Sequence, residues 1–185
     1  MLMSHNEKIK SDFKGTIIDL ETIEPFCYEY PDADDSRHYS TLIPTTLGYI
    51  TKNELNILCA EGRSALDELK KETIKLLSSM EKPLYAFQCR FERAIFYHCY
   101  NFTLEFDGEL NKKPREWKGT ACVELGIPNY GDPFYNVGKK CISAWLRGDY
   151  ENTIKHNRSC LLKERDILIK RNYRKPDKLR ILVNE

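Results

Sequence analysis

The sequence has no long apolar run and no closely spaced pair of cysteines, and these absences exclude several classes of protein. No stretch approaches the roughly 20 apolar residues of a transmembrane helix, and residues 1–12 are too polar for the core of a signal peptide. The seven cysteines form no CxxC pair, and neither they nor the four scattered histidines show zinc-site spacing. We therefore expect reduced thiols in a cytoplasmic protein with no membrane partner.

The length of the chain suits one folded domain. Its 185 residues can bury a full core without disulfide staples. No internal repeat or low-complexity segment divides the sequence. We expect a flexible N-terminus over residues 1–13, a single α/β domain over residues 14–172 and a C-terminal tail over residues 173–185.

The net charge is only +1, but acids and bases are separated along the chain. Residues 19–35 contain seven acids and no Lys or Arg. Residues 163–180 contain eight bases against three acids, and further bases gather within residues 112–118. An acidic centre with basic flanks suits a site that holds metal ions and receives a phosphate backbone. The alternative interpretation is that these are ordinary solvated helix faces.

The order of the predicted elements is more informative than any single element. Runs of β-branched and aromatic residues predict strands, and apolar residues at helical spacing predict helices. The predicted strands cover residues 14–20, 46–51, 55–59, 84–87 and 102–106. The predicted helices cover residues 64–80, 90–100 and 150–172, and residues 108–148 are expected to form short helices joined by loops. A doubly wound fold would instead alternate strand and helix from the start.

A short acidic pair ends the first predicted strand. Residues i and i+2 of a strand point to the same face, so Asp19 and Glu21 would project side by side. Two such carboxylates repel each other unless a cation lies between them or one takes up a proton. Hard divalent cations such as Mg²⁺ bind oxygen-rich arrangements of this kind. An ordinary strand end with solvent-facing acids is the other interpretation.

Two further stretches carry residues that suit the same chemistry. A strand ends and a helix begins near residue 89, which places Glu92 in the first helical turn, where an acid favours the helix dipole whatever its function. His156 and Cys160 are four residues apart on the last helix and are therefore adjacent on one face. This face lies roughly opposite the apolar stripe of the helix, so His156 either serves a site or faces solvent.

Three motifs, taken in order, resemble those of the DEDD 3′–5′ exonuclease superfamily. They are Ile18-Asp19-Leu20-Glu21-Thr22, Gln88-Cys89-Arg90-Phe91-Glu92 and His156-Asn157-Arg158-Ser159-Cys160. The likeness is to the branch whose motifs read roughly FDIETTG, NGxxFD and Y/HNxxD, and it spans about residues 14–169. It implies a ribonuclease H-like α/β fold with a central mixed five-stranded sheet flanked by helices, and the predicted order of elements agrees with that fold.

The resemblance implies a two-metal nuclease. In the family, four carboxylates hold two Mg²⁺ or Mn²⁺ ions; one ion generates the attacking hydroxide, and both stabilise charge on the phosphate. Carried over by motif, the metal ligands would be Asp19, Glu21, Glu92 and Cys160. His156 would position or deprotonate the attacking water. The expected partner is nucleic acid, DNA or RNA, bound at a single-stranded 3′ end.

The sequence departs from the family motifs at two ligands. Cys160 stands where the family has Asp, and a thiolate suits Zn²⁺ far better than Mg²⁺ or Mn²⁺. Glu92 also replaces an Asp and is longer by one methylene, which active sites tolerate badly. Three readings follow: an exonuclease with an altered site in which Glu164 supplies the missing oxygen, a catalytically impaired homologue that binds nucleic acid or a partner protein, or a working enzyme disarmed by an introduced cysteine. Asp166 points away from Cys160 and is a poor substitute.

The two tryptophans, Trp117 and Trp145, lie in an aromatic-rich region. Exposed aromatic rings can stack on nucleic-acid bases. Large aromatic side chains are nevertheless more often part of a core, and we expect both tryptophans there.

Overall fold

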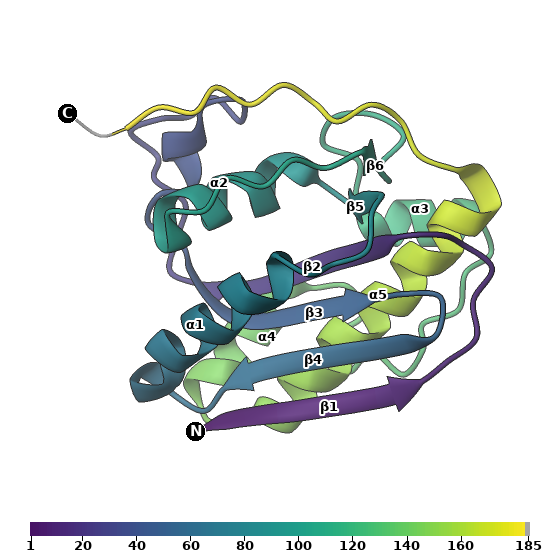
Figure 1. Ribbon diagram of the computed structural model, residues 1–185, viewed down its shortest axis with the longest axis horizontal. Coiled ribbons are helices and arrows are strands. Elements are labelled where there is room, and N and C mark those ends of the chain that lie inside the picture. Colours follow the sequence, from purple (N-terminus) through teal and green to yellow (C-terminus); the bar gives the residue numbers. More distant parts are fainter. Residues whose placement is uncertain (184–185) are drawn as a thin grey trace.

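The computed structural model describes residues 1–183 and is an α/β arrangement of one mixed, open sheet flanked by helices (Figure 1). The strands are β1 (Leu2–Lys8), β2 (Thr16–Ile23), β3 (Ile43–Ile50), β4 (Glu54–Ala60), β5 (Leu84–Ala86) and β6 (Gly108–Glu109). The helices are α1 (Leu66–Leu77), α2 (Cys89–Tyr100), α3 (Lys118–Glu124), α4 (Gly138–Leu146) and α5 (Tyr150–Arg171), with short 3₁₀ turns η1 (Ser36–Tyr39) and η2 (Arg63–Ala65).

The strands follow the order β1-β4-β3-β2-β5-β6 across the sheet. The first four of these pair antiparallel, whereas β5 pairs parallel with both β2 and β6. Helices α1 and α2 lie on one face of the sheet, and α4 and α5 lie on the other (Figure 1). The long helix α5 packs across β2, β3 and β4, so its residues meet the acidic end of β2.

The central strand β2 fixes the position of the acidic pair. Ile17 and Ile18 are fully buried, as expected for β-branched residues in a strand that is covered on both faces. Asp19 pairs across the ladder with Gly48 of β3, where an added Cβ would collide with the side chain of Asn157 in α5. The absence of a side chain at Gly48 therefore lets α5 approach the sheet directly beside Asp19.

Two predicted features of the sheet are wrong. The sheet has six strands and not five, because Leu2–Lys8 of the expected flexible N-terminus form β1 and pair with β4. Most residues of this edge strand are polar, so no apolar alternation reveals it in the sequence. No strand forms over the described residues 102–106, although Leu104 and Phe106 are buried, because ladder pairing with β5 begins only at β6.

The other predicted strands and long helices are confirmed, with ends shifted by a few residues. The predicted tail over residues 173–185 is held against the domain over its described part. Arg174 pairs with Glu109 of β6, and the backbone N–H of Arg180 donates to the Asp34 carbonyl at 2.7 Å. Figure 1 shows this yellow segment passing β6 and α2 on its way to η1. Residues 184–185 lie outside the described residues.

Within residues 1–183, no helix combines the length and the apolar character that crossing a membrane requires.

Candidate functional site

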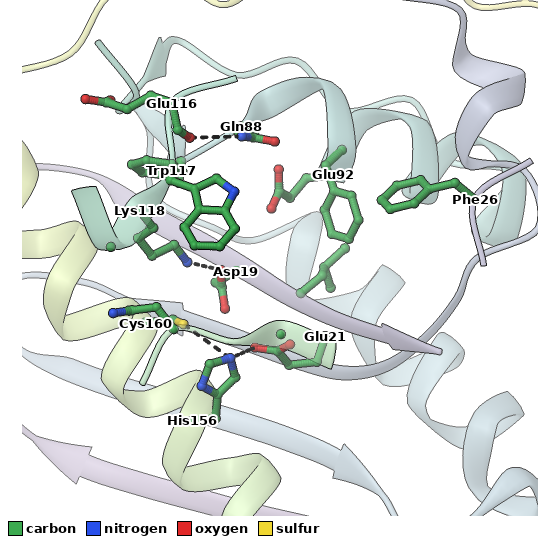
Figure 2. A pocket seen from close by; sticks show the side chains of 16 residues that line it. Asp19, Glu21, Phe26, Gln88, Glu92, Glu116, Trp117, Lys118, His156 and Cys160 are labelled. Atoms are coloured by element: carbon green, nitrogen blue, oxygen red, sulfur yellow. Dashed lines mark hydrogen bonds and ion pairs between the residues drawn. The ribbon is translucent and has the colours of Figure 1, made fainter. Parts of the chain in front are cut away.

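One pocket of about 400 Å³ gathers the residues that the three motifs single out. Asp19 and Glu21 enter it from β2, Glu92 from the first turn of α2, and His156 and Cys160 from α5 (Figure 2). Glu92 lies across the cavity from His156 (Figure 2). Side chains from three distant segments of the sequence therefore face one space.

The carboxylates of Asp19 and Glu21 repel each other in the structure, as the strand pattern predicts. Asp19 is held by Asn157, whose Nδ2 donates to Asp19 Oδ2 at 2.7 Å and to the Asp19 carbonyl at 3.3 Å. Burial raises the pKa of Glu21 to about 7; His156 opposes this shift, and the neighbouring Asp19 adds to it. The pocket therefore holds one carboxylate with a fixed amide donor beside a second whose charge is disfavoured.

Lys118, the first residue of α3, supplies a cation that the motifs did not place in the site. Its Nζ lies 3.0 Å from Asp19 Oδ1 and 2.6 Å from Glu164 Oε1. Burial opposes its charge, but the acidic groups around it raise the pKa of Lys118 well above its usual range. In the sequence Lys118 was one of several bases within residues 112–118, and α3 is too short for periodicity to reveal which way it points.

Two glutamates are buried beside this ion pair. Glu92 is 4 % exposed, and its Oε2 has no hydrogen-bond partner among residues 1–183. Glu164 is fully buried and does not line the pocket; its Oε1 forms an ion pair with Lys118, and neither of its carboxylate oxygens has a hydrogen-bond partner among residues 1–183. Burial is the main cause that raises the pKa of both carboxyls well above the usual range, and Asp19 adds to it. A further cation in the pocket would relieve this excess of acidic groups.

His156 is buried and does not face solvent. Its Nδ1 donates to Asp132 Oδ1 at 2.7 Å, and Asp132 also accepts from Lys163 Nζ at 2.8 Å. The backbone N–H groups of Phe134 and Asn136 donate to the same carboxylate at 2.9 and 2.8 Å. Sequence reasoning missed Asp132 because it lies in the loop before α4, where no periodic pattern indicates what it contacts.

This hydrogen bond directs the other ring nitrogen of His156 into the pocket. Nε2 lies 3.7 Å from Glu21 Oε1 and 3.8 Å from Cys160 Sγ. Burial opposes the imidazolium charge, but Cys160, Glu21 and Asp132 together raise the pKa of His156 to about 11. Burial also raises the pKa of the Cys160 thiol. The acidic neighbours of His156 therefore favour its protonated form, which is unsuited to act as a base.

Two overlapping groups of side chains can hold a metal ion. The first consists of Glu21, Cys141 and His156, and the second of Asp19, Glu21 and Cys160. The ligand atoms within each group all lie within 4.8 Å of one another. Glu92, which the motifs also predicted as a ligand, belongs to neither group. Cys141 comes from α4 and was missed because it is one of seven scattered cysteines.

The two tryptophans have different environments. Trp145 is in the core, as expected, and its indole Nε1 donates to the Ala60 carbonyl at 2.8 Å. Trp117 is 72 % exposed and lines the pocket together with the partly exposed Phe26, so its expected place in the core is wrong. Figure 2 shows the Trp117 ring over the cavity. Trp117 precedes Lys118, and the α3 start that turns the lysine inward leaves the indole outside.

Most bases of the C-terminal region are engaged within the protein. Five of the eight bases in residues 163–180 form ion pairs, namely Lys163 with Asp132, Arg165 with Asp166, Arg171 with Glu116, Arg174 with Asp177 and Arg180 with Asp34. The basic flank that the sequence suggested is therefore largely neutralised by nearby acids. Asp166 is held by Arg165 and by the Tyr130 hydroxyl, which agrees with its predicted exclusion from the site.

No protein-family model, curated protein or solved structure matches this chain. The fold and the pocket define an α/β protein with a buried group of carboxylate, lysine, histidine and thiol side chains. Parts of that group can hold a metal ion.

Proposed function

We propose that the chain is a metal-dependent 3′–5′ exonuclease of ribonuclease H-like fold, similar to the DEDD superfamily, that hydrolyses terminal phosphodiesters of DNA or RNA. The observation that carries the proposal is the meeting of all three motifs in one pocket. The element order from β2 onward supports it too: three strands, then helix, strand, helix, strand and helices, the order on which the resemblance rests. Trp117 at the mouth of the pocket suits stacking on a terminal base.

The donors fit one hard metal ion better than two. Asp19 and Glu21 offer neighbouring carboxylates, and Glu92 offers a buried oxygen without a hydrogen-bond partner in the described residues. The Lys118 ammonium, however, already lies against Asp19 and Glu164, where it supplies a fixed positive charge. A bound Mg²⁺ or Mn²⁺ would provide Lewis acidity toward the phosphate and would activate water. We propose that Lys118 takes the role of the second ion.

The residues of the chain then have separate roles. Lys118 stabilises negative charge that develops on the phosphate, as a preorganised cation in a site of low polarity does. His156, held by Asp132, keeps its proton on the pocket side and is suited to donate it or to orient a water molecule, in contrast to the base role that the family motif implies. Asn157 fixes the orientation of Asp19.

The purified chain is expected to shorten 5′-labelled single-stranded DNA or RNA one nucleotide at a time from the 3′ end, in the presence of Mg²⁺ or Mn²⁺. Asp19→Asn should lower the rate about 100-fold or more, because it removes a metal-binding charge from the centre of the pocket. Time courses resolved on denaturing gels measure the stepwise shortening and the rate of the variant. Asp67→Asn, which changes an exposed acid of α1, is the matched control and should retain the wild-type rate. Intact DNA and RNA with either metal would exclude the proposal.

A second candidate function is favoured by the ion pairs of Lys118. They compensate the charge of Asp19 without any metal ion, as expected of a catalytically impaired homologue that binds nucleic acid or a partner protein. Such a protein would bind single-stranded nucleic acid without metal, with an affinity that falls as the salt concentration rises. This binding would persist in Asp19→Asn.

Cys160→Asp separates the two candidates. If the site is an exonuclease weakened by the thiol, the variant should gain about tenfold or more in Mn²⁺-dependent rate, since a carboxylate binds a hard ion better than a thiol does. Cys160→Asn is the control because it has the same shape without the charge. An equal gain in both variants would argue against a restored ligand. No activity in either, with nucleic-acid binding unchanged, would favour the impaired homologue.

A further inference from the structure

The inner side of the pocket is different in chemistry from its mouth. Glu21 of β2, Cys141 of α4 and His156 of α5 form one group of possible metal ligands, and Cys160 lies beside His156 on α5. His156 Nε2 lies 3.7 Å from Glu21 Oε1 and 3.8 Å from Cys160 Sγ, and Cys141 joins Glu21 and His156 in a group within 4.8 Å. Both thiols are nearly fully buried. One sulfur, one nitrogen and one oxygen atom therefore converge, and the second sulfur, Cys160 Sγ, lies next to the nitrogen.

The two separations from His156 Nε2 are close to those of a tetrahedral zinc site, whereas the two thiols share no 4.8 Å group and would move toward each other when they bind one ion. Zinc bonds of about 2.0–2.3 Å to nitrogen, oxygen and sulfur at tetrahedral angles place neighbouring ligand atoms about 3.3–3.8 Å apart. The two distances from His156 Nε2, 3.7 and 3.8 Å, need contractions of only a few tenths of an ångström or less. The ligands come from three elements far apart in the sequence, which is why no zinc-site spacing is visible there.

The surroundings of His156 are those of a metal ligand. A histidine that binds a metal donates its other ring N–H to a carboxylate or carbonyl, which fixes the tautomer and the ring orientation. Here Asp132 Oδ1 accepts from Nδ1 at 2.7 Å, and Asp132 is itself held by Lys163 and by two backbone N–H groups. Because Asp132 holds Nδ1 of His156, the other ring nitrogen, Nε2, is directed at Glu21 and Cys160.

We propose that Glu21, Cys141, His156 and Cys160 form a binding site for one thiophilic divalent ion of the Zn²⁺ class. The donor set selects the ion, because thiolate and imidazole favour Zn²⁺ and Co²⁺, whereas Mg²⁺ requires oxygen ligands. Asp19, Glu92 and Lys118 remain outside this site, whereas Glu21 and His156 also belong to the proposed nuclease site, so the zinc-bound state and the nuclease state are alternatives. The inference does not rest on the exonuclease proposal, since the ion is recognised by its ligands alone.

Titration of the metal-stripped full chain with Co²⁺ tests the site. The wild type should bind one equivalent and develop the thiolate-to-cobalt charge-transfer and visible bands of a tetrahedral cobalt–sulfur centre, and one equivalent of Zn²⁺ should abolish both. Cys141→Ser and Cys160→Ser should each weaken Co²⁺ binding about 100-fold or more. Loss of a residue that only supports a ligand typically lowers metal affinity by about 10- to 100-fold, so a larger loss indicates a ligand. Cys99→Ser is the matched control: Cys99 donates to the Leu42 carbonyl at 2.9 Å, a contact that serine can also make, and it should bind as the wild type does.

A second measurement does not depend on the variants folding. In the wild type under partly denaturing conditions, one equivalent of Zn²⁺ should protect Cys141 and Cys160 from alkylation, as detected by mass spectrometry. Cys27 is partly exposed and serves as the internal control, because its alkylation should be the same with and without Zn²⁺. A cobalt spectrum without sulfur bands, or one that is lost in Asp19→Asn and kept in both serine variants, would overturn the proposal. Failure of the nuclease assay with an intact cobalt–sulfur spectrum would reject the exonuclease and leave the metal site standing.

Discussion

Asp132→Ala is expected to lower the free energy of unfolding by about 3–5 kcal/mol, because it removes one member of a buried network and leaves its charged partners unpaired. Asp132 is 2 % exposed, and its carboxylate accepts from His156 Nδ1 at 2.7 Å and from Lys163 Nζ at 2.8 Å. Lys163 is only 1 % exposed and cannot turn to water without moving α5. Urea-induced unfolding of the metal-stripped chain at pH 7 measures the loss.

Two further variants test whether the network is the cause. Asp12→Ala removes an exposed acid and should change the free energy of unfolding by less than about 0.5 kcal/mol. Lys163→Met is itself expected to destabilise the protein, but the double variant Asp132→Ala/Lys163→Met should lose at least about 1 kcal/mol less than the sum of the single variants. Additive losses would show that the two charges do not interact, and a loss below about 1 kcal/mol in Asp132→Ala would show that the network is not formed in solution.

The pH dependence of stability provides an independent check on Asp132. Burial alone would raise the pKa of this carboxyl, but hydrogen bonds from His156 and Lys163 hold it well below its usual range. A carboxyl with a lowered folded-state pKa contributes stability above its unfolded pKa of about 3.9, and this contribution is lost as the pH falls toward the folded value. The difference between wild type and Asp132→Ala should therefore shrink below about pH 4.

The parts of the site that lie on regular elements were predictable from the sequence. Strand alternation places Asp19 and Glu21 on one face of β2, and helical spacing places His156 beside Cys160 on α5. The order of strands and helices from β2 onward also follows from apolar periodicity. These patterns succeed because burial of one face of an element imposes a period on its sequence.

The groups that surround these residues could not be predicted in the same way. Asp132 lies in an irregular loop, and Lys118 begins a helix of only seven residues, so neither position has a period that fixes its direction. Cys141 is buried against α5, but burial is usual for cysteine and does not by itself indicate a site. β1 was missed for a related reason, because a polar edge strand is held by backbone hydrogen bonds that leave little trace in side-chain pattern.

Lys118→Met should convert a site that is stable without metal into one that depends on a divalent cation. The ammonium forms ion pairs with Asp19, at 3.0 Å, and Glu164, at 2.6 Å, and the lysine side chain is 18 % exposed. Its removal leaves two acids in a buried, carboxylate-rich pocket, and we expect a loss of about 3 kcal/mol in the presence of a chelator. Methionine keeps most of the volume of the side chain, so the loss reports chiefly on charge.

Added Mn²⁺ is then expected to stabilise Lys118→Met more than it stabilises the wild type, because an ion can bind the carboxylates that the lysine has released. Binding to the folded state alone at 100 times the dissociation constant would restore about 2.7 kcal/mol. Thermal unfolding in a chelator and in increasing Mn²⁺ measures this difference, with Lys113→Met, an exposed lysine close in sequence, as the control. Equal responses of Lys118→Met and wild type to Mn²⁺ would mean that the lysine does not stand in for a metal ion. A larger response in the variant alone would identify the Lys118 ammonium as the built-in cation of this pocket.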